Sequence, residues 1–326
     1  MKVLVLGATG FIGGHIAKAA LAEGWQVSGF RRDPTFTGHL GESAAIKWIT
    51  GDLNETDSLR GAMEGIEVLF HAAAYYPRRE RTKTMAEHMA AAKREMETVL
   101  AAAKASGIRR VVYTSTLTAI SLPPAGSNRI ADERDVYRLG DFPESVYAET
   151  KALMEQMALA ANDGLEVVVT NPTAVFGPGD VHLTLGGLLL LVAHGYAVIW
   201  LPALVNVIDV RDVAAAHILA AKVGKPGERY ILGAHNFTVR ETIGIVAKAS
   251  GRRPPLLKFP LWLLGPVIWL SDLFPSIPLP ANHLRGINRW QHYNTVKAEH
   301  DLGLQKRPFE ETVLDALAWF KERGEL

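Results

Sequence analysis

The chain has 326 residues, and its 35 lysines and arginines nearly balance its 34 aspartates and glutamates, for a net charge of +1. This length suits two domains or one α/β unit with an added lobe, and the content of 48% hydrophobic and 21% charged residues excludes wholesale disorder. The balanced charge removes the electrostatic case for a nucleic-acid or anionic-membrane partner, and the absence of cysteine excludes disulfides, thiolate nucleophiles and zinc–cysteine sites.

The apolar segments predict neither a secretory signal nor a membrane-spanning helix. The first apolar run, from Val3 to Leu6, is far shorter than the core of a signal peptide and ends in glycine. Two later runs, 183–208 and 256–280, are interrupted by prolines, by histidine or by charged residues, and neither reaches the roughly 18 apolar residues that a span needs. We expect buried core in the first run, an irregular lid or lobe in the second, and a soluble, cytoplasmic protein.

Residues 3–171 alternate between strand-like and helix-like patterns. We expect strands at 3–6, 26–30, 46–49, 67–71, 110–115 and 166–171, and helices at 10–23, 56–63, 84–106 and 145–161. Nearly all-apolar strands joined by helices are typical of a parallel sheet that is covered on both faces and connected by right-handed crossovers. The sequence therefore predicts an α/β fold with a doubly wound parallel sheet.

After Pro172 the alternation weakens, and proline, glycine and tryptophan become frequent. One further unit is expected, with a strand at 205–209, a helix at 210–222 and a strand at 229–233. We therefore assign 1–172 and 205–234 to the main domain, and 173–204 and 235–326 to a smaller lobe.

A glycine-rich turn links the first strand to the first helix. Gly7, Gly10 and Gly13 have the spacing at which the first glycine makes the tight turn, the second admits a pyrophosphate and the third allows helix and strand to pack closely. The free N–H groups and the dipole of the helix N-terminus would then bind the phosphates. This position, directly between strand and helix, predicts a dinucleotide-binding Rossmann fold rather than a purely structural turn.

Two arginines stand at the end of the second strand, where NAD-binding folds usually carry an acidic residue that holds the ribose hydroxyls. The guanidinium groups of Arg31 and Arg32 suit the 2′-phosphate of NADP, and the alternative is a solvated strand end. At the end of the third strand, Asp52 either accepts a hydrogen bond from the adenine amino group or serves as a turn or cap residue. We expect NADP(H) to be favoured over NAD(H), and no metal, because the histidines show no metal-site spacing.

Tyr147 and Lys151 are four residues apart, on one face of an expected helix. A tyrosine with an ordinary pKa near 10 is a poor acid–base catalyst at pH 7, and a neighbouring cation lowers that pKa. The spacing is common by chance and recurs at Tyr293 and Lys297. Only the first pair follows a strand with a hydroxyl-rich end, at 114–116, which should open into the crevice where such sheets bind ligands. We therefore predict a catalytic role for the first pair alone.

Taken together, these motifs resemble the extended short-chain dehydrogenases/reductases. Within that family the sequence looks most like the dihydroflavonol-4-reductase-like and related aldehyde and ketone reductases, whose members are commonly grouped as NAD-dependent epimerases/dehydratases. The resemblance covers most of the chain, and its motifs are residues 7–13, Asp52-Leu53, His71-Ala72-Ala73, Thr114-Ser115-Thr116, Tyr147 with Lys151, Asn171-Pro172 and residues 206–214.

The resemblance implies a role for each site residue. It places the catalytic hydroxyl on Thr116, with Ser115 as the alternative, and makes Thr116, Tyr147 and Lys151 the catalytic triad. The residues expected to hold the cofactor are Gly7, Thr9, Gly10, Phe11, Ile12, Gly13, Arg31, Arg32, Asp52, Leu53, Ala72, Ala73, Ala74, Thr114, Tyr147, Lys151 and Pro172.

The substrate pocket is expected between the smaller lobe and the loops that follow the strands. Tyr75, Tyr76 and Phe176 suit an apolar or aromatic carbonyl compound. Arginines at 78, 79 and 81 either meet a phosphate, as in a sugar nucleotide or a CoA ester, or form a solvated charge run.

The two long helices at 84–106 and 145–161 raise two further points. By the resemblance they could pair with a second subunit as a four-helix bundle, although ordinary packing on the sheet explains their apolar residues equally well. The family also carries an asparagine on the first of them that supports the catalytic lysine, and Ala92 stands at that position here. Either activity is lower than usual, or another group substitutes for the asparagine.

These expectations define one leading function and two alternatives. The leading hypothesis is the NADPH-dependent reduction of a ketone or aldehyde to an alcohol through the triad. The alternatives are a nucleotide-sugar epimerase that keeps its NAD bound, and a non-catalytic NADP-binding sensor, prompted by Ala92. Dehydration is disfavoured, because Leu117 and Thr118 stand where a dehydratase needs acidic residues.

Overall fold

The computed structural model describes residues 1–41, 43, 45–76, 83–273 and 284–326. Its centre is a parallel sheet of seven strands in the order β10-β6-β5-β4-β1-β2-β3. The strands are β1 (Lys2–Leu6), β2 (Gln26–Arg31), β3 (Ile46–Thr50), β4 (Val68–His71), β5 (Arg110–Thr114), β6 (Glu166–Pro172) and β10 (Arg229–Leu232). In the register of the central strands, Leu6 lies opposite Phe30 on one side and His71 on the other.

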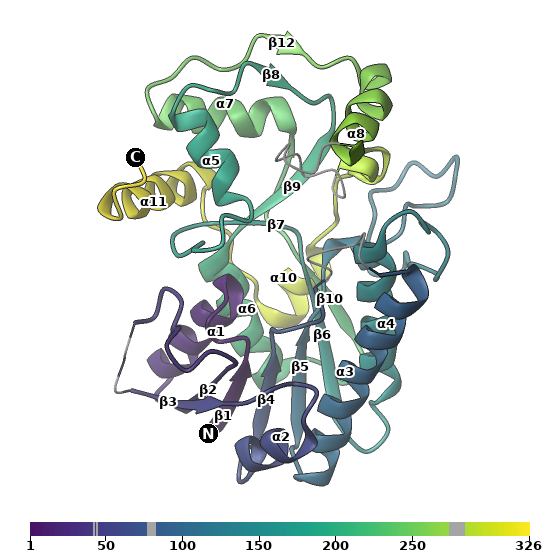
Figure 1. The fold of residues 1–326 in the computed structure, drawn as a ribbon, viewed down its shortest axis with the longest axis vertical. Helices are drawn as coiled ribbons and strands as arrows, with labels where there is room; N and C mark the ends of the chain where they lie inside the picture. The colour runs from purple at the N-terminus through teal and green to yellow at the C-terminus, as the bar shows by residue number, and fades with distance from the viewer. Residues whose placement is uncertain (42, 44, 77–82, 274–283) are drawn as a thin grey trace.

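Helices cover both faces of the sheet, as the apolar strands predict (Figure 1). Side chains alternate along β1, so that Val3 and Val5 join a core with α1 (Phe11–Ala22) and α6 (Val210–Val223). Leu4 and Leu6 join the opposite core, with α2 (Thr56–Met63), α3 (Met85–Ala105) and α4 (Val146–Ala160). The predicted doubly wound fold is confirmed, and most of the predicted helix and strand ends agree with the structure within one residue.

The strand order reverses between β1 and β4, because the chain first moves outward to β2 and β3 and then returns to build β4, β5, β6 and β10. The loops that leave β1 and β4 therefore diverge, and they open a crevice at the carboxyl ends of the strands. This crevice is where ligands bind in folds of this kind.

A smaller lobe stands beyond those carboxyl ends (Figure 1). It contains a three-stranded sheet of β7 (Ala174–Phe176), β9 (Leu204–Asp209) and β11 (His235–Thr238), and a strand pair of β8 (Ile199–Trp200) with β12 (Leu257–Lys258). The helices α5 (Gly186–Ala193), α7 (Val239–Ala249) and α11 (Phe309–Glu322) surround an apolar core that includes Phe309, Val313 and Phe320. The lobe also has α8 (Leu264–Leu273), and α10 (Val296–Leu302) packs back on α6 and β10.

The smaller lobe differs from the sequence analysis in its details. The helix α5 was not expected. The short strands β7, β8, β11 and β12 were not expected either, since two to four residues are too few to show a strand period. β9 was expected in the main domain, and it pairs instead with β7 and β11, whereas β10 does join the seven-stranded sheet. The boundaries of the two parts stay a prediction.

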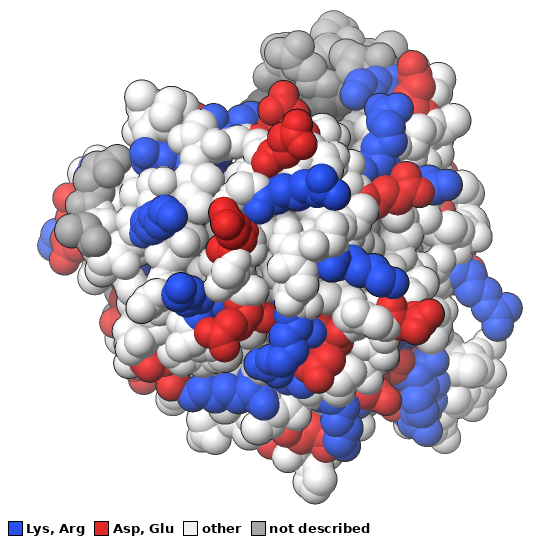
Figure 2. Space-filling view, turned by 90° about the horizontal axis from the view of Figure 1, so that it is seen from below, with Lys and Arg blue, Asp and Glu red and all other residues white. Residues whose placement is uncertain are grey.

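Charged side chains of both signs are interspersed on the end of the molecule opposite the smaller lobe (Figure 2). Several of them form ion pairs, such as Lys222 with Glu23 and Arg109 with Glu166. In the described part of the chain, no helix is long and apolar enough to cross a bilayer.

Among the described residues, Glu155 on α4 and Arg229 on β10 form a buried ion pair. The Arg229 Nη1 atom lies 2.8 Å from the Glu155 carboxylate, and the two side chains are only 7% and 4% exposed. Removal of either partner leaves the other charge buried without compensation, and this is far more costly than the loss of an exposed pair.

We therefore expect Glu155→Ala to lower the free energy of unfolding by about 3–5 kcal/mol in urea titrations. The matched control is Glu97→Ala, which removes an exposed partner of Lys93 on α3 and should cost less than about 1 kcal/mol. Equal losses in the two variants would contradict the structural importance of the buried pair.

Candidate active site

The turn after β1 has a shape that its glycines alone permit. Gly7 has a φ of +83°, and a Cβ atom there would lie 2.9 Å from the Ala72 backbone. A Cβ atom on Gly13 would lie 2.1 Å from the Gly7 carbonyl oxygen. The Gly10 N–H donates to that same oxygen at 2.9 Å. The turn, α1 and the end of β4 are therefore packed as closely as backbones allow.

The N-terminus of α1 is open to an anion. Gly10 is its N-cap and supplies no side-chain acceptor for the first N–H groups of the helix. These donors and the helix dipole fit the pyrophosphate of a dinucleotide. Around them, Thr9 and Ile12 are half-buried, and Phe11 belongs to the core beneath.

The end of β2 carries the two arginines in different surroundings. The Arg31 guanidinium lies 5.0 Å from the centre of the Trp48 ring on β3, whereas Arg32 is exposed. Asp52 accepts hydrogen bonds from the backbone and the side chain of Asn54, at 2.8 and 2.9 Å. These bonds, together with the charge of Arg32, hold the pKa of Asp52 below its usual value. One carboxylate oxygen of Asp52 thus stabilises the local turn by accepting both of these bonds.

The floor of the crevice is formed where β4 and β6 end. The Ala72 N–H donates to the Leu6 carbonyl oxygen at 3.0 Å, and the alanines at 72–74 and the neighbouring Leu53 are half-buried. Pro172 is buried at the end of β6. Thr114 points to the α6 side of the sheet, where its hydroxyl lies 2.8 Å from His217 Nε2. The Thr114 hydroxyl is thus already hydrogen-bonded to another side chain of the protein.

The structure brings Thr116, Tyr147 and Lys151 together. Thr116 follows β5, while Tyr147 and Lys151 lie on α4, whose N-cap Ser145 accepts from the Ala148 N–H at 3.2 Å. A hydrogen bond joins the Thr116 and Tyr147 side chains, and the Lys151 Nζ atom lies 5.9 Å from the centre of the Tyr147 ring. Thr116 and Lys151 are each 9% exposed. The Thr116 hydroxyl, the Tyr147 phenol and the Lys151 amine thus lie together in a largely buried site.

Burial dominates the electrostatics of these groups. It raises the pKa of Tyr147, against the effect of the Thr116 hydrogen bond. It lowers the pKa of Lys151 to about 8, against the charge of Glu95. The pKa of Tyr147 is therefore raised, and not lowered as expected, because desolvation of the phenol is the largest effect on it.

A buried carboxylate fixes the strand end that carries Thr116. Glu155 accepts from the Ser115 hydroxyl, and from the Asn171 side-chain amide at 2.5 Å. The same amide donates to the Thr116 carbonyl oxygen at 3.1 Å. The hydroxyl of Ser115, the alternative to Thr116, is thus already hydrogen-bonded to Glu155.

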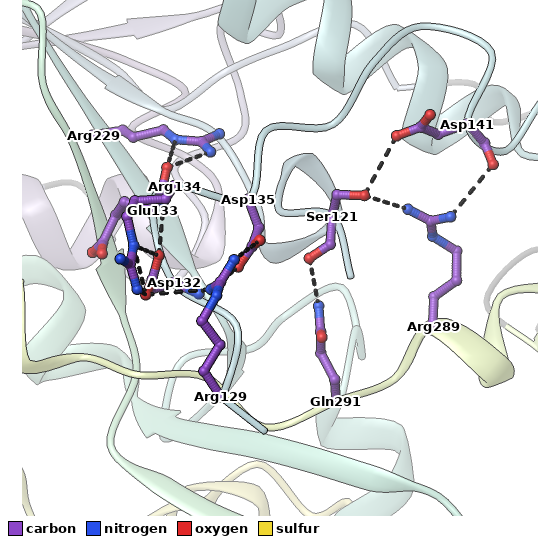
Figure 3. A network of polar contacts seen from close by, with 10 residues as sticks. All are labelled: Ser121, Arg129, Asp132, Glu133, Arg134, Asp135, Asp141, Arg229, Arg289 and Gln291. Atoms are coloured by element: carbon purple, nitrogen blue, oxygen red, sulfur yellow. Dashed lines mark hydrogen bonds and ion pairs between the residues drawn. The ribbon is translucent and has the colours of Figure 1, made fainter. Parts of the chain in front are cut away.

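The loop that follows β5 is held by ion pairs within it and by hydrogen bonds from distant parts of the chain (Figure 3). Arg229 donates to the Glu133 carbonyl oxygen at 2.6 and 3.0 Å. The other contacts drawn are Arg134 with Asp132, Arg129 with Asp132 and Asp135, Ser121 with Gln291, Arg289 and Asp141, and Arg289 with the Asp141 carbonyl oxygen.

The three residues expected to contact the substrate lie in different surroundings. Tyr76 is 54% exposed, and its ring lies 5.6 Å from that of Tyr147. Tyr75 is half-buried, and its hydroxyl lies 2.7 Å from His88 Nδ1. The expected place of Phe176 on the pocket wall is corrected, because its side chain is 3% exposed and packs edge-on against Phe309 in the smaller lobe. The arginines at 78, 79 and 81 lie outside the described residues.

The second tyrosine–lysine pair has other contacts. The Lys297 Nζ atom donates to Glu228 at 2.6 Å, and Tyr293 is buried beside Ile120 and Ala131. Within the described ranges, no three His, Asp or Glu side chains are grouped as a metal site requires.

Sequence reasoning missed several buried polar groups near the site. Glu95 on α3 and Glu155 on α4 are 6% and 3% exposed as whole residues, and only α3 also carries exposed charges. His15 Nε2 donates to the Pro178 carbonyl oxygen at 2.8 Å, and the His15 ring stacks on that of His39, with the ring centres 4.5 Å apart. A long polar residue on the apolar face of a helix is the one signal that could have indicated the two glutamates.

The predicted homodimer stays a prediction. Met96 is fully buried in the core of its own chain, which leaves Met85, Met89 and Leu100 as the half-buried apolar residues of α3.

Comparisons with known proteins agree with this geometry. A family model described as "NAD dependent epimerase/dehydratase family" matches residues 3–233. A putative dihydroflavonol 4-reductase from Synechocystis sp. is 32% identical, covering 98% of this chain and 94% of its own, and sterol demethylase protein B from Methylococcus capsulatus is 31% identical, covering 99% of both. The crystal structure of gox2253 is 29% identical, with a TM-score of 0.84 and 99% coverage of both chains.

The packing of the glycine turn predicts the effect of a single methyl group. Gly13→Ala should weaken the binding of NADPH, followed by tryptophan fluorescence, by at least about tenfold, because the turn must shift to admit the Cβ atom. The control is Gly61→Ala on α2, where a Cβ atom meets nothing within 4 Å. That variant should bind as the parent does, and unchanged binding by Gly13→Ala would refute a phosphate site at this turn.

Proposed function

Because the chain belongs to the NAD-dependent epimerase/dehydratase family, we propose that it is an NADPH-dependent reductase that converts a ketone or aldehyde into an alcohol. The observation that carries the proposal is the hydrogen-bonded pair of Thr116 and Tyr147, with Lys151 beside the phenol ring. The names of the relatives support the coarser statement that the chain is an NAD(P)-dependent oxidoreductase, and a putative dihydroflavonol 4-reductase among them favours a carbonyl substrate.

A bound nicotinamide would supply the hydride that reaches the carbonyl carbon. The chain's own groups act on the oxygen of that carbonyl. The Thr116 and Tyr147 hydroxyls donate hydrogen bonds to the oxygen as negative charge develops on it, and Tyr147 then gives its proton to the alkoxide. Both hydroxyls are held close together before the substrate arrives, and the hydrogen bond between them would be exchanged for bonds to the substrate oxygen.

Lys151 is assigned two tasks in this proposal. Its ammonium stabilises the phenolate that remains after Tyr147 has given up its proton, and it binds the cofactor ribose. With a pKa of about 8, Lys151 is largely protonated at neutral pH. The charge is thus present where the phenolate forms.

The preference for NADPH rests on the end of β2. Arg32 is exposed, so its guanidinium is available to a 2′-phosphate, and Arg31 is stacked on Trp48. A phosphate bound there would receive charge-assisted hydrogen bonds, which are the stronger kind.

The substrate is proposed to be an apolar or aromatic carbonyl compound. The exposed ring of Tyr76, edge-on to Tyr147, offers an apolar wall at the mouth of the site. Turnover of a panel of aromatic ketones and aldehydes, followed by NADPH consumption, tests this class directly.

Tyr147→Phe keeps the ring and removes the proton donor, so carbonyl turnover should fall by at least about a hundredfold while the protein still binds NADPH. Tyr293→Phe is the matched control from the second tyrosine–lysine pair and should retain turnover. Near-parental turnover by Tyr147→Phe would disprove the assignment of the acid.

Arg32→Ala should weaken NADPH binding by about tenfold, or 1.4 kcal/mol, and leave NADH binding unchanged, because only NADPH carries the 2′-phosphate. Parallel fluorescence titrations with NADPH, NADH and NAD measure this, with Arg60→Ala on the exposed face of α2 as the control. Tighter binding of NAD than of NADPH by the parent would point instead to an epimerase that retains its NAD.

A further inference from the structure

The smaller lobe carries an uncharged, apolar segment at residues 259–270, with the sequence FPLWLLGPVIWL. The indole N–H groups of its two tryptophans are the only side-chain hydrogen-bonding groups in the segment. It contains a short 3-10 helix, η3 (Leu261–Leu263), from which α8 continues directly. A stretch of this length is too short to span a bilayer, and it is typical either of a buried core or of a segment that lies in a membrane interface.

One face of this segment is not buried in the protein. Trp262 is 76% exposed and Trp269 is 63% exposed, and Gly265 and Pro266 between them are exposed as well. These four residues are spaced by three, four and seven positions from the first, so they lie on one side of the helix. Leu264, on the opposite side, is buried in the core of the lobe. The segment is therefore anchored along one side, and both tryptophans lie on the other.

The strand pair next to this segment is also apolar and exposed. β8 and β12 pair in parallel, with Ile199 opposite Leu257, and these two side chains are 44% and 64% exposed. The Phe259 N–H donates to the Trp200 carbonyl oxygen at 2.9 Å, which joins the segment to the strand pair. Figure 1 shows β8, β12 and α8 together at the end of the molecule away from the seven-stranded sheet. We call residues 256–270 together with β8 the lobe-tip surface.

The charges next to the lobe-tip surface are positive. Residues 242–271 contain no aspartate or glutamate, whereas Arg252, Arg253 and Lys258 are all exposed. The net charge of +1, which argues against an anionic membrane for the chain as a whole, conceals this local excess. Basic side chains near an apolar surface attract anionic lipid headgroups, and tryptophan is enriched where hydrocarbon meets the headgroups. A protein partner is usually oriented by about ten hydrogen bonds, and the apolar segment offers only two side-chain donors.

We propose that the lobe-tip surface binds peripherally to bilayers with anionic headgroups. The rings of Trp262 and Trp269 lie at the boundary between headgroups and hydrocarbon, and Arg253 and Lys258 contact the lipid phosphates. The attachment is to one leaflet only, because the apolar segment is too short to cross the bilayer. The inference concerns this surface alone and holds for any reaction that the crevice supports.

The first test removes the two indoles from the full chain. Trp262→Ala combined with Trp269→Ala should weaken co-sedimentation with vesicles of phosphatidylcholine and phosphatidylglycerol by at least about tenfold, because the rings lose their burial in the bilayer. The control, Val223→Ala combined with Leu314→Ala, removes two side chains that are 56% and 55% exposed elsewhere and should bind as the parent does. Since all four positions are exposed, both double variants should unfold close to the parent's midpoint in urea.

The second test removes positive charge from the same surface. Arg253→Gln combined with Lys258→Gln should weaken binding to these anionic vesicles by about fivefold for each charge removed, and it should not change binding to vesicles of phosphatidylcholine alone. Lys93→Gln, which removes an exposed lysine on α3, is the control and should leave both kinds of binding unchanged.

Three results would overturn the proposal. The parent could fail to bind the anionic vesicles, or the variant without Trp262 and Trp269 could bind them as tightly as the parent. The third is measured by sedimentation velocity without lipid. Dimers of the parent that the two tryptophan substitutions disperse, with no vesicle binding, would assign the lobe-tip surface to a second copy of the chain.

Discussion

The position of the reactive groups depends on the carboxylate of Glu155. This residue lies four positions after Lys151 and eight after Tyr147, so all three occupy one face of α4. Its oxygens bind Ser115, which follows β5, Asn171 near the end of β6, and Arg229 at the start of β10. The helix therefore cannot slide or rotate against the sheet without breaking buried, charge-assisted bonds, and this is what keeps the Tyr147 phenol at the Thr116 hydroxyl.

Around this anchor the interior is polar but almost uncharged. Burial keeps His71 and His217 neutral, with pKa values of about 3 and 4, and keeps the Tyr113 phenol protonated. A neutral surrounding screens little, so the few charges that remain act strongly on one another.

Much of this arrangement could be predicted from the sequence, for reasons that are local. The β–α alternation, the glycine turn and the spacing of Tyr147 and Lys151 each depend on residues close together in the chain, and periodicity or stereochemistry shows them. Glu95 and Glu155 could not be found in this way, because their burial results from the packing of α3, α4 and β10, which are far apart in sequence. Phe176 was misplaced for the same reason, since its partner Phe309 lies in the last helix.

The contacts of the loop after β5 carry a consequence for the order in which the protein is made. The loop spans residues 117–142, yet its partners are Arg229, Arg289 and Gln291, which are synthesised much later. The first six strands and the glycine turn are complete by residue 172, so a nascent chain can assemble its nucleotide-binding half early. The wall beside Thr116 is fixed only once the last fifth of the chain has begun to emerge, so this side of the crevice is completed after the glycine turn.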